Sequence, residues 1–218
     1  MNRTKNVYVR LTFLRVGDID TLNEKYQAHA SIEARWPCQF DKLTSSLSAE
    51  DQKRLLDGKS VSLANYQQNH WHPQLYIENA VGDLKEQLRY TAKRSKEDNE
   101  FYVCEHRDVK GLFWEKLELY HFPADVQDLS ISIASMFYND RVVLQPDPRY
   151  MSGVNREAFS DQQEWSLYPH VDTEQRYVKE FLFQKRQKND DDEEDDENTI
   201  NTEDRHRPIV TVTCHAGM

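Results

Sequence analysis

The sequence is poor in the residues that mark several protein classes. Its 218 residues include only three cysteines, Cys38, Cys104 and Cys214, and their wide spacing indicates no disulfide framework. Six glycines and seven prolines are too few for a collagen-like or low-complexity chain. No run of about 18 apolar residues could cross a bilayer as a helix. With 38% apolar residues, the chain is expected to form one soluble domain over 1–218.

Positive charge is also scarce. There are 28 Lys and Arg against 38 Asp and Glu, a net charge of −10. A nucleic-acid partner is therefore not expected, because neutralising phosphates needs a basic face. Much of the acid is concentrated between residues 185 and 206, which have no large apolar cluster. This stretch lacks the oxygen spacing of a calcium loop, so it predicts a solvated, mobile insertion.

Alternation of apolar and polar residues is the dominant local pattern. Every second residue of 7–13 and of 28–36 is therefore expected on the buried face of a strand. Gly17 and Asp18 are expected to end the first of these strands. The buried positions are Val7, Val9, Leu11, Phe13, Ala28, Ala30, Ile32, Ala34 and Trp36.

Further short strands are predicted at 84–91, 101–106, 111–120, 129–138, 141–144, 176–183 and 208–214, with the last two forming a hairpin. One short helix is expected over 48–58, with Ser48 as its N-cap and Gly58 just beyond its end. Together these elements predict an all-β fold, an immunoglobulin-like antiparallel β-sandwich of about ten strands with one short helix.

Candidate catalytic and metal-binding residues are sparse. His70 and His72 share one side of a strand, but no third ligand is evident near them. Cys104 and His106 have no context typical of a nucleophilic cysteine, and there is no glycine-rich phosphate loop. The sequence therefore predicts no enzyme, no cofactor and no metal site.

One motif is specific. The run Phe122-Pro-Ala-Asp-Val-Gln127 resembles the Phe-Pro-x-Asp-x-Gln signature of the Cys-loop receptors, which are pentameric ligand-gated ion channels. Trp36, Trp71-His-Pro73, Glu164-Trp165 and the strand at 208–213 follow the order of that family's landmarks. The resemblance implies an extracellular ligand-binding domain on the outer side of the plasma membrane, in a homopentamer, with a transmembrane domain expected after 218.

The family's two loop cysteines would fall at Glu115 and Leu129, so the resemblance is to a divergent member without the loop disulfide. It implies a ligand pocket between subunits, where aromatic faces hold a cation. Here that cage is poor, which argues against a simple quaternary amine as the ligand; Glu78 with Glu33 suggests a cation or a polar amphiphile. The residues implied are Ile77, Glu78, Met136, Phe137, Tyr138, Phe181 and Phe183 on one subunit, and Ser31, Glu33, Cys104 and His106 on its neighbour.

The resemblance also implies that Phe122, Pro123, Asp125 and Gln127 form a loop that couples the pocket to the pore. In the family, the Asp of this loop often pairs with an arginine, and His215 stands near that position here. Protonation of His215 would then strengthen a contact with Asp125 at low pH. Two alternatives remain open, namely a free-standing secreted binding protein of the same fold and, less favoured, an unrelated β-sandwich enzyme.

Overall fold

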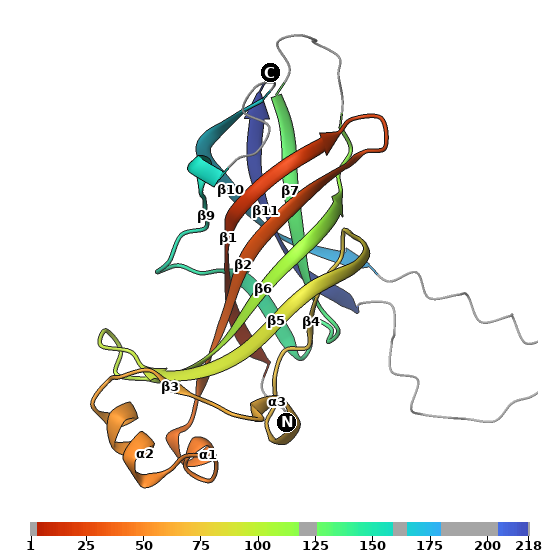
Figure 1. Cartoon of the computed structure of the whole chain (residues 1–218). Coiled ribbons are helices and arrows are strands. Elements are labelled where there is room, and N and C mark those ends of the chain that lie inside the picture. Colours follow the sequence, from red (N-terminus) through yellow and green to blue (C-terminus); the bar gives the residue numbers. More distant parts are fainter. Residues whose placement is uncertain (1–3, 118–125, 159–164, 180–204, 218) are drawn as a thin grey trace, which may run out of the picture.

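Two β-sheets pack face to face in the computed structural model, which describes residues 4–117, 126–158, 165–179 and 205–217 (Figure 1). Sheet A has seven strands in the order β3-β5-β6-β2-β1-β8, with β9 also paired to β1, and sheet B has four in the order β10-β11-β7-β4. The strands are β1 (Lys5–Asp20), β2 (Lys25–Cys38), β3 (Val61–Ser62), β4 (Leu75–Ile77), β5 (Ala80–Arg94), β6 (Phe101–Trp114), β7 (Val126–Ser135), β8 (Val142–Pro146), β9 (Gly153–Val154), β10 (Ser166–Lys179) and β11 (His206–Gly217). The predicted all-β, sandwich-like architecture is confirmed.

Sheet A is mixed, so the prediction of antiparallel sheets is wrong there. The short strands β8 and β9 both run parallel to β1, with Val7 opposite Leu144 and Thr12 opposite Gly153. After β7 the chain leaves sheet B, joins the free edge of β1 in sheet A and follows that strand in its own direction. Sheet B is antiparallel throughout.

The predicted inner faces are confirmed. All four apolar residues between Val7 and Phe13 are fully buried, and the alternate positions from Ala28 to Trp36 are at most 1% exposed. The first strand does not end at Gly17, however. It continues to Asp20, with Asp18 in the left-handed region at φ 51° and a register shift between Gly17 and Asp20. The left-handed conformation of Asp18 therefore shifts the register of β1 but does not end the strand.

The region 101–120 was expected to hold two strands, and up to Trp114 it is one. Gly111 stays in β6, paired with Ala28 of β2. A side chain at Gly111 would collide with the side chain of Leu84 on β5, so glycine here makes room for a packed neighbour and does not break the strand. Residues 118–120 lie outside the described part of the chain.

The helix at 48–58 is confirmed as α2 (Ala49–Leu56). The Ser48 hydroxyl accepts a hydrogen bond from the Asp51 N–H at 3.1 Å, and Gly58 has φ 77°. The prediction of a single helix is wrong, because the short helices α1 (Phe40–Thr44) and α3 (Tyr66–Asn69) and the 3-10 turn η1 (Arg156–Ala158) are also present. No helix within the described ranges is long and apolar enough to cross a membrane.

The predicted hairpin of 176–183 and 208–214 is confirmed over the described residues, 176–179 and 208–214. Arg176 lies opposite Ile209 and Lys179 opposite His206, and β10 begins earlier than expected, at Ser166. Most of the acidic insertion, residues 185–204, lies outside the described residues.

The C-terminal end of β11 lies beside the start of β7. Gly217, the last described residue, pairs with Val126, which directly follows the segment containing the Phe-Pro motif. The turn between β1 and β2 is found at the same end of the molecule, and α1 to α3 lie at the opposite end (Figure 1). The sandwich therefore has one end where the chain finishes and a helical end far from it.

Candidate functional site

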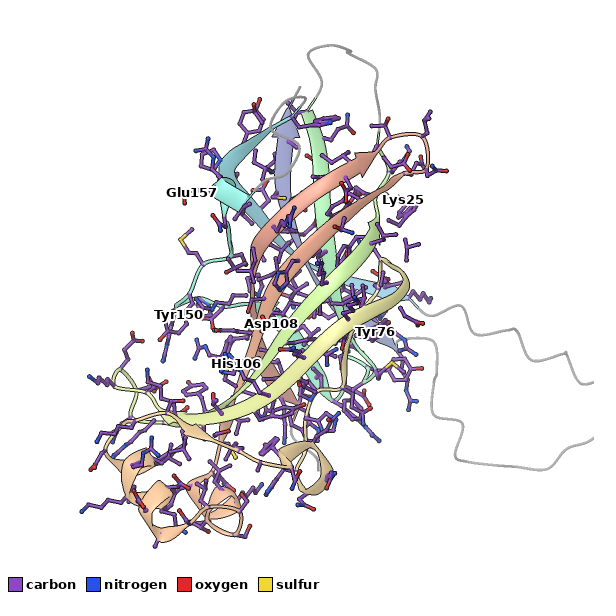
Figure 2. All side chains as sticks on the ribbon, in the orientation of Figure 1. Lys25, Tyr76, His106, Asp108, Tyr150 and Glu157 are labelled. Atoms are coloured by element: carbon purple, nitrogen blue, oxygen red, sulfur yellow. The ribbon has the colours of Figure 1, made fainter. Side chains whose placement is uncertain are left out.

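A cavity of about 530 Å³ opens on the outer face of sheet A. Three of the four residues predicted for one side of the pocket line it, namely Glu33, Cys104 and His106. They come together because Glu33 of β2 is the direct cross-strand partner of His106 of β6, and Cys104 is two residues away on the same face. Figure 2 shows His106 on this surface, with Tyr150 nearby on the loop after β8. Ser31 lies on β2 with a half-exposed side chain but does not line the cavity.

A second cavity of about 900 Å³ lies between the start of β1 and the helical end. It is lined in part by Trp71, Phe101 and Lys5, whose ammonium group sits 3.7 Å from the Trp71 ring centroid. None of the predicted site residues line it. The smaller cavity is therefore the candidate site, because the predicted residues gather there.

The floor of the candidate cavity is an ion pair that the sequence reasoning missed. Arg35 and Asp147 form a two-point contact in which Nη2 donates to Oδ1 at 2.8 Å and Nε donates to Oδ2. Their side chains are only 11% and 3% exposed. Burial raises the pKa of Asp147, but the hydrogen bond and charge of Arg35, together with the backbone N–H groups of Arg149 and Tyr150, outweigh burial and leave the pKa below its usual range. Tyr8, Tyr102 and Tyr150 surround the guanidinium group, at 4.9, 4.9 and 5.6 Å.

Arg149 joins the loop after β8 to the turn between β5 and β6. It donates to Asp98 at 2.6 Å and pairs with Glu97 at 2.9 Å, while the Tyr102 hydroxyl donates to Asp98 at 2.7 Å. Since Tyr102 also faces Arg35, one side of the cavity is fixed by interlocked charges and rings. The aromatic faces that could hold a foreign cation are already covered by arginine.

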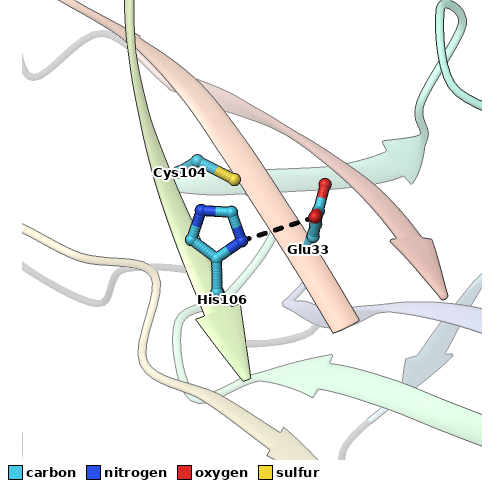
Figure 3. A group of neighbouring side chains, drawn as sticks. All are labelled: Glu33, Cys104 and His106. Atoms are coloured by element: carbon cyan, nitrogen blue, oxygen red, sulfur yellow. Dashed lines mark ion pairs between the residues drawn. The ribbon is translucent and has the colours of Figure 1, made fainter. Parts of the chain in front are cut away.

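Glu33 is held between Arg10 and His106. The Arg10 guanidinium lies 2.5 Å from its carboxylate, and His106 Nδ1 lies 3.4 Å from Oε1. The hydrogen bond with His106, together with Arg10 and against the effect of burial, lowers the pKa of Glu33 to about 2. Burial, and secondarily the charge of Glu33, raises the pKa of the Cys104 thiol to about 12, so this thiol is protonated at neutral pH. Figure 3 shows the side chains of Glu33, Cys104 and His106 together.

The residues predicted for the other half of the pocket belong to sheet B or its flanking loops. Glu78 follows β4 and pairs with Arg176 of β10 at 2.6 Å. Met136 is 55% exposed, and Tyr138 is faced by Arg205 and Arg207 at 5.7 and 5.3 Å. Phe137 stacks on Trp71, with 6.3 Å between ring centroids. Ile77 is buried in the core. Phe181 and Phe183 lie outside the described residues.

The two predicted half-sites are thus on different sheets of one chain. Glu33 and Glu78 do not converge, and each carboxylate is neutralised by its own arginine, Arg10 or Arg176. Within one chain, Glu33 and Glu78 therefore do not form a shared cation site. Comparison with known proteins adds no assignment, since no family model matches the sequence and a search of curated proteins gave no significant match.

The residues predicted to couple the pocket to a pore are only partly described. Phe122, Pro123 and Asp125 lie outside the described ranges, and Gln127 is a buried residue of β7. His215 has both ring nitrogens engaged, Nδ1 with Asp128 at 2.7 Å and Nε2 with Asp172 at 2.9 Å. The predicted partner Asp125 lies outside the described residues, and two other carboxylates hold this imidazole.

Glu115 stands where the family's first loop cysteine would be. Its carboxylate accepts hydrogen bonds from the backbone N–H of Ser130, at 3.0 Å, and from the Ser130 hydroxyl. Ser130 directly follows Leu129, the second missing cysteine position, and Leu129 is fully buried. Burial raises the pKa of Glu115. Hydrogen bonds therefore tie the end of β6 to β7 at Ser130.

We expect the His215 cluster to make stability depend on pH. Burial disfavours the imidazolium form, but the bonds to Asp128 and Asp172 outweigh burial and raise the pKa of His215. His170, stacked on His215 at 6.2 Å, shares Asp172. Because the folded-state pKa exceeds the unfolded value of about 6.5, the contribution is complete below that pH and is lost as pH rises through the folded-state pKa.

The measurement is the unfolding temperature of the parent and of His215→Gln between pH 5.5 and 8.5. The parent's advantage over the variant should shrink as pH rises. His29→Gln is the matched control. An advantage that stays constant over this range, or grows with pH, would rule out the assigned coupling.

Proposed function

We propose that this chain is the extracellular ligand-binding domain of a pentameric ligand-gated ion channel of the Cys-loop receptor family, with that family's immunoglobulin-like sandwich. The observation that carries the proposal is the placement of the two half-sites. Met136 and Tyr138 flank sheet B, whereas Glu33 and His106 lie on the outer face of sheet A. One chain cannot close such a pocket, but head-to-tail neighbours in a ring would bring the two halves together.

The arrangement of the C-terminal end supports the same proposal. Val126, which follows the segment with the Phe-Pro motif, pairs with Gly217. The apolar side chains of Val126 and of Leu22, in the β1–β2 turn, are 51% and 93% exposed. In the proposed receptor, this end faces the membrane, and a transmembrane domain would follow. Ligand binding between subunits would then bias the pore through its different affinity for two states.

The ligand we propose is not a simple quaternary amine. The tyrosine faces of both half-sites are occupied by the protein's own cations, with Arg35 near Tyr102 and Tyr150, and Arg207 near Tyr138. An added cation would have to displace a guanidinium group from each ring. Micromolar binding of acetylcholine in a calorimetric titration would contradict this part of the proposal.

The ring is tested by cross-linking across the proposed interface. We expect Met136→Cys combined with Ser31→Cys, in a chain whose Cys38 and Cys104 are replaced by Ser, to give products of up to five chains with a bismaleimide. Each cysteine of one chain would lie near the other cysteine of its neighbour, so successive links close a ring. The products are counted by denaturing gel electrophoresis after cross-linking at high protein concentration.

The matched controls are the two variants in which only one of the introduced cysteines is present beside the buried Cys214. In a head-to-tail ring, neither control can be linked beyond dimers. A ladder that stops at two chains in the double variant would contradict the ring. So would efficient dimers of Met136→Cys alone, because they would indicate that the same face of two chains meets in a twofold contact.

A further inference from the structure

Three side chains in the candidate cavity bring together a carboxylate, a thiol and an imidazole. Glu33 projects from β2, and Cys104 and His106 project from the same face of β6. One donor atom from each lies within 4.8 Å of the other two (Figure 3). We propose that Glu33, Cys104 and His106 form a binding site for a divalent, borderline-soft cation such as Zn²⁺.

The spacing of the donor atoms fits this ion. Zinc binds imidazole nitrogen at about 2.0–2.1 Å and carboxylate oxygen at about 2.0–2.2 Å, so two such ligands at a tetrahedral angle are about 3.4 Å apart. The distance between His106 Nδ1 and Glu33 Oε1 is 3.4 Å. A zinc-bound sulfur, at about 2.3 Å from the metal, would lie about 3.6 Å from the nitrogen. Because the donor atoms lie within 4.8 Å of one another, Cys104 Sγ has to move by about 1.2 Å or less.

Thr91 of β5 orients the imidazole for this role. Its hydroxyl oxygen lies 2.9 Å from His106 Nε2. A metal-bound histidine usually donates its other N–H to an oxygen, which fixes the tautomer and the direction of the ring. In the metal-bound form, Nε2–H would donate to Thr91, and the Nδ1 lone pair would bind the metal in place of the hydrogen bond to Glu33. Thr91 is thus a positioning residue and not a ligand.

The electrostatic surroundings permit a cation. Arg10 and Arg35 are close, but each is matched by a carboxylate, Glu33 or Asp147. Binding converts the Cys104 thiol to a thiolate and releases its proton to solvent, which adds one negative charge to the site. The fourth coordination position would face the cavity of about 530 Å³, where water or a ligand can enter.

The sequence placed these three residues in a pocket but predicted no metal site, because the carboxylate beside His106 comes from strand pairing and not from a neighbour in the sequence. Glu33 is distant from His106 in the sequence and becomes its neighbour only through the pairing of β2 with β6. All three ligands come from one chain. The proposal therefore does not depend on the ring, and a monomer that binds zinc would leave it intact.

The first test is a Co²⁺ titration of the variant Cys38→Ser/Cys214→Ser, in which Cys104 is the only thiol. We expect a thiolate-to-cobalt charge-transfer band that saturates at one ion per chain and disappears when Zn²⁺ is added. Cys104→Ser in the same background should lose the band entirely. Ions held by the acidic residues of the chain give no such band, so they cannot imitate this result.

The second test measures Zn²⁺ affinity by competition with Co²⁺. Glu33→Gln and His106→Ala should each weaken binding by at least about tenfold, and Thr91→Val by about tenfold through loss of positioning. His170→Ala is the matched control and should have no effect. Circular dichroism reports whether each variant is folded.

Alkylation of Cys104 in the sole-thiol variant gives a readout that needs no ligand substitution. One equivalent of Zn²⁺ should slow the reaction at least about tenfold. The proposal is overturned if the sole-thiol variant shows no charge-transfer band, if Zn²⁺ does not protect Cys104, or if folded His106→Ala binds Zn²⁺ as tightly as the parent.

Discussion

Replacing Arg107 with methionine is expected to lower the free energy of unfolding by about 3–5 kcal/mol, the usual cost of removing one partner of a buried ion pair. Glu105 and Arg107 lie on the core-facing side of β6, with exposures of 1% and 8%. The Arg107 Nη2 and Nε groups donate to Glu105 Oε1 at 3.0 and 3.2 Å. Among the described residues, the hydrogen-bond donor that then remains to the carboxylate is the Tyr90 hydroxyl, at 2.8 Å from Oε2. Urea unfolding near pH 7 measures the loss.

The double variant Arg107→Met/Glu105→Leu tests the cause. Replacing both charges by apolar side chains is often neutral or stabilising, so much of the lost stability should return. Glu86→Gln is a second control, because the Arg107–Glu86 contact of 3.3 Å is at the exposed edge and should be worth less than about 1 kcal/mol. A double variant as unstable as the sum of its single variants would show that the charge pair is not the cause.

Local periodicity was sufficient to predict the inner faces of the long strands. Val7 to Phe13 and Ala28 to Trp36 alternate without interruption, and every predicted buried position is buried. The N-cap of α2 was equally clear, since Ser48 and Gly58 mark both ends. Such patterns involve residues close together in the sequence, so they predict the type of each element and its buried face. They do not specify which strand lies beside which, and the parallel edge of β8 and β9 was missed for that reason.

Glycine and the left-handed backbone show where local signals were misread. Gly17 was expected to end a strand and Gly111 to begin one, but both lie within strands. At Gly111 the missing side chain is needed for Leu84 of a neighbouring strand, which is a tertiary reason. The short helices α1 and α3 have no side-chain cap, so the residues around them carry little signal.

The candidate cavity could be predicted only in part. The resemblance led to Glu33, Cys104 and His106, which do lie together. It did not lead to Arg35 and Asp147, whose positions are 112 residues apart and meet because the loop after β8 passes beside β2. Glu33 and Glu78 were read as free charges, yet both are paired with arginines. Charge pairing between residues distant in the sequence is a property of the folded chain, and composition does not reveal it.

Arg35→Met is expected to lower the free energy of unfolding by about 3–5 kcal/mol near pH 7, because it leaves the 3% exposed side chain of Asp147 without its cationic partner. Two N–H groups, from Arg149 at 2.8 Å and Tyr150 at 3.2 Å, still reach this carboxylate. Arg35→Lys keeps the charge but loses the two-point fork and the stacking on tyrosine rings, so it should fall between parent and Met variant. Urea unfolding of all three proteins measures the order.

The pH dependence separates this ion pair from loss of packing alone. Arg35 holds the folded-state pKa of Asp147 below its unfolded value of about 3.9, so the stability it contributes is complete above that pH and is lost as pH falls through the lowered pKa. In Arg35→Met, burial acts unopposed by the guanidinium and raises the pKa of Asp147. The gap in stability between parent and variant should therefore be widest near pH 7 and narrow as pH falls from the raised pKa of the variant to the lowered pKa of the parent. A gap of constant size would instead assign the loss to packing of the arginine stem among its tyrosines, because that contact does not change with protonation of Asp147.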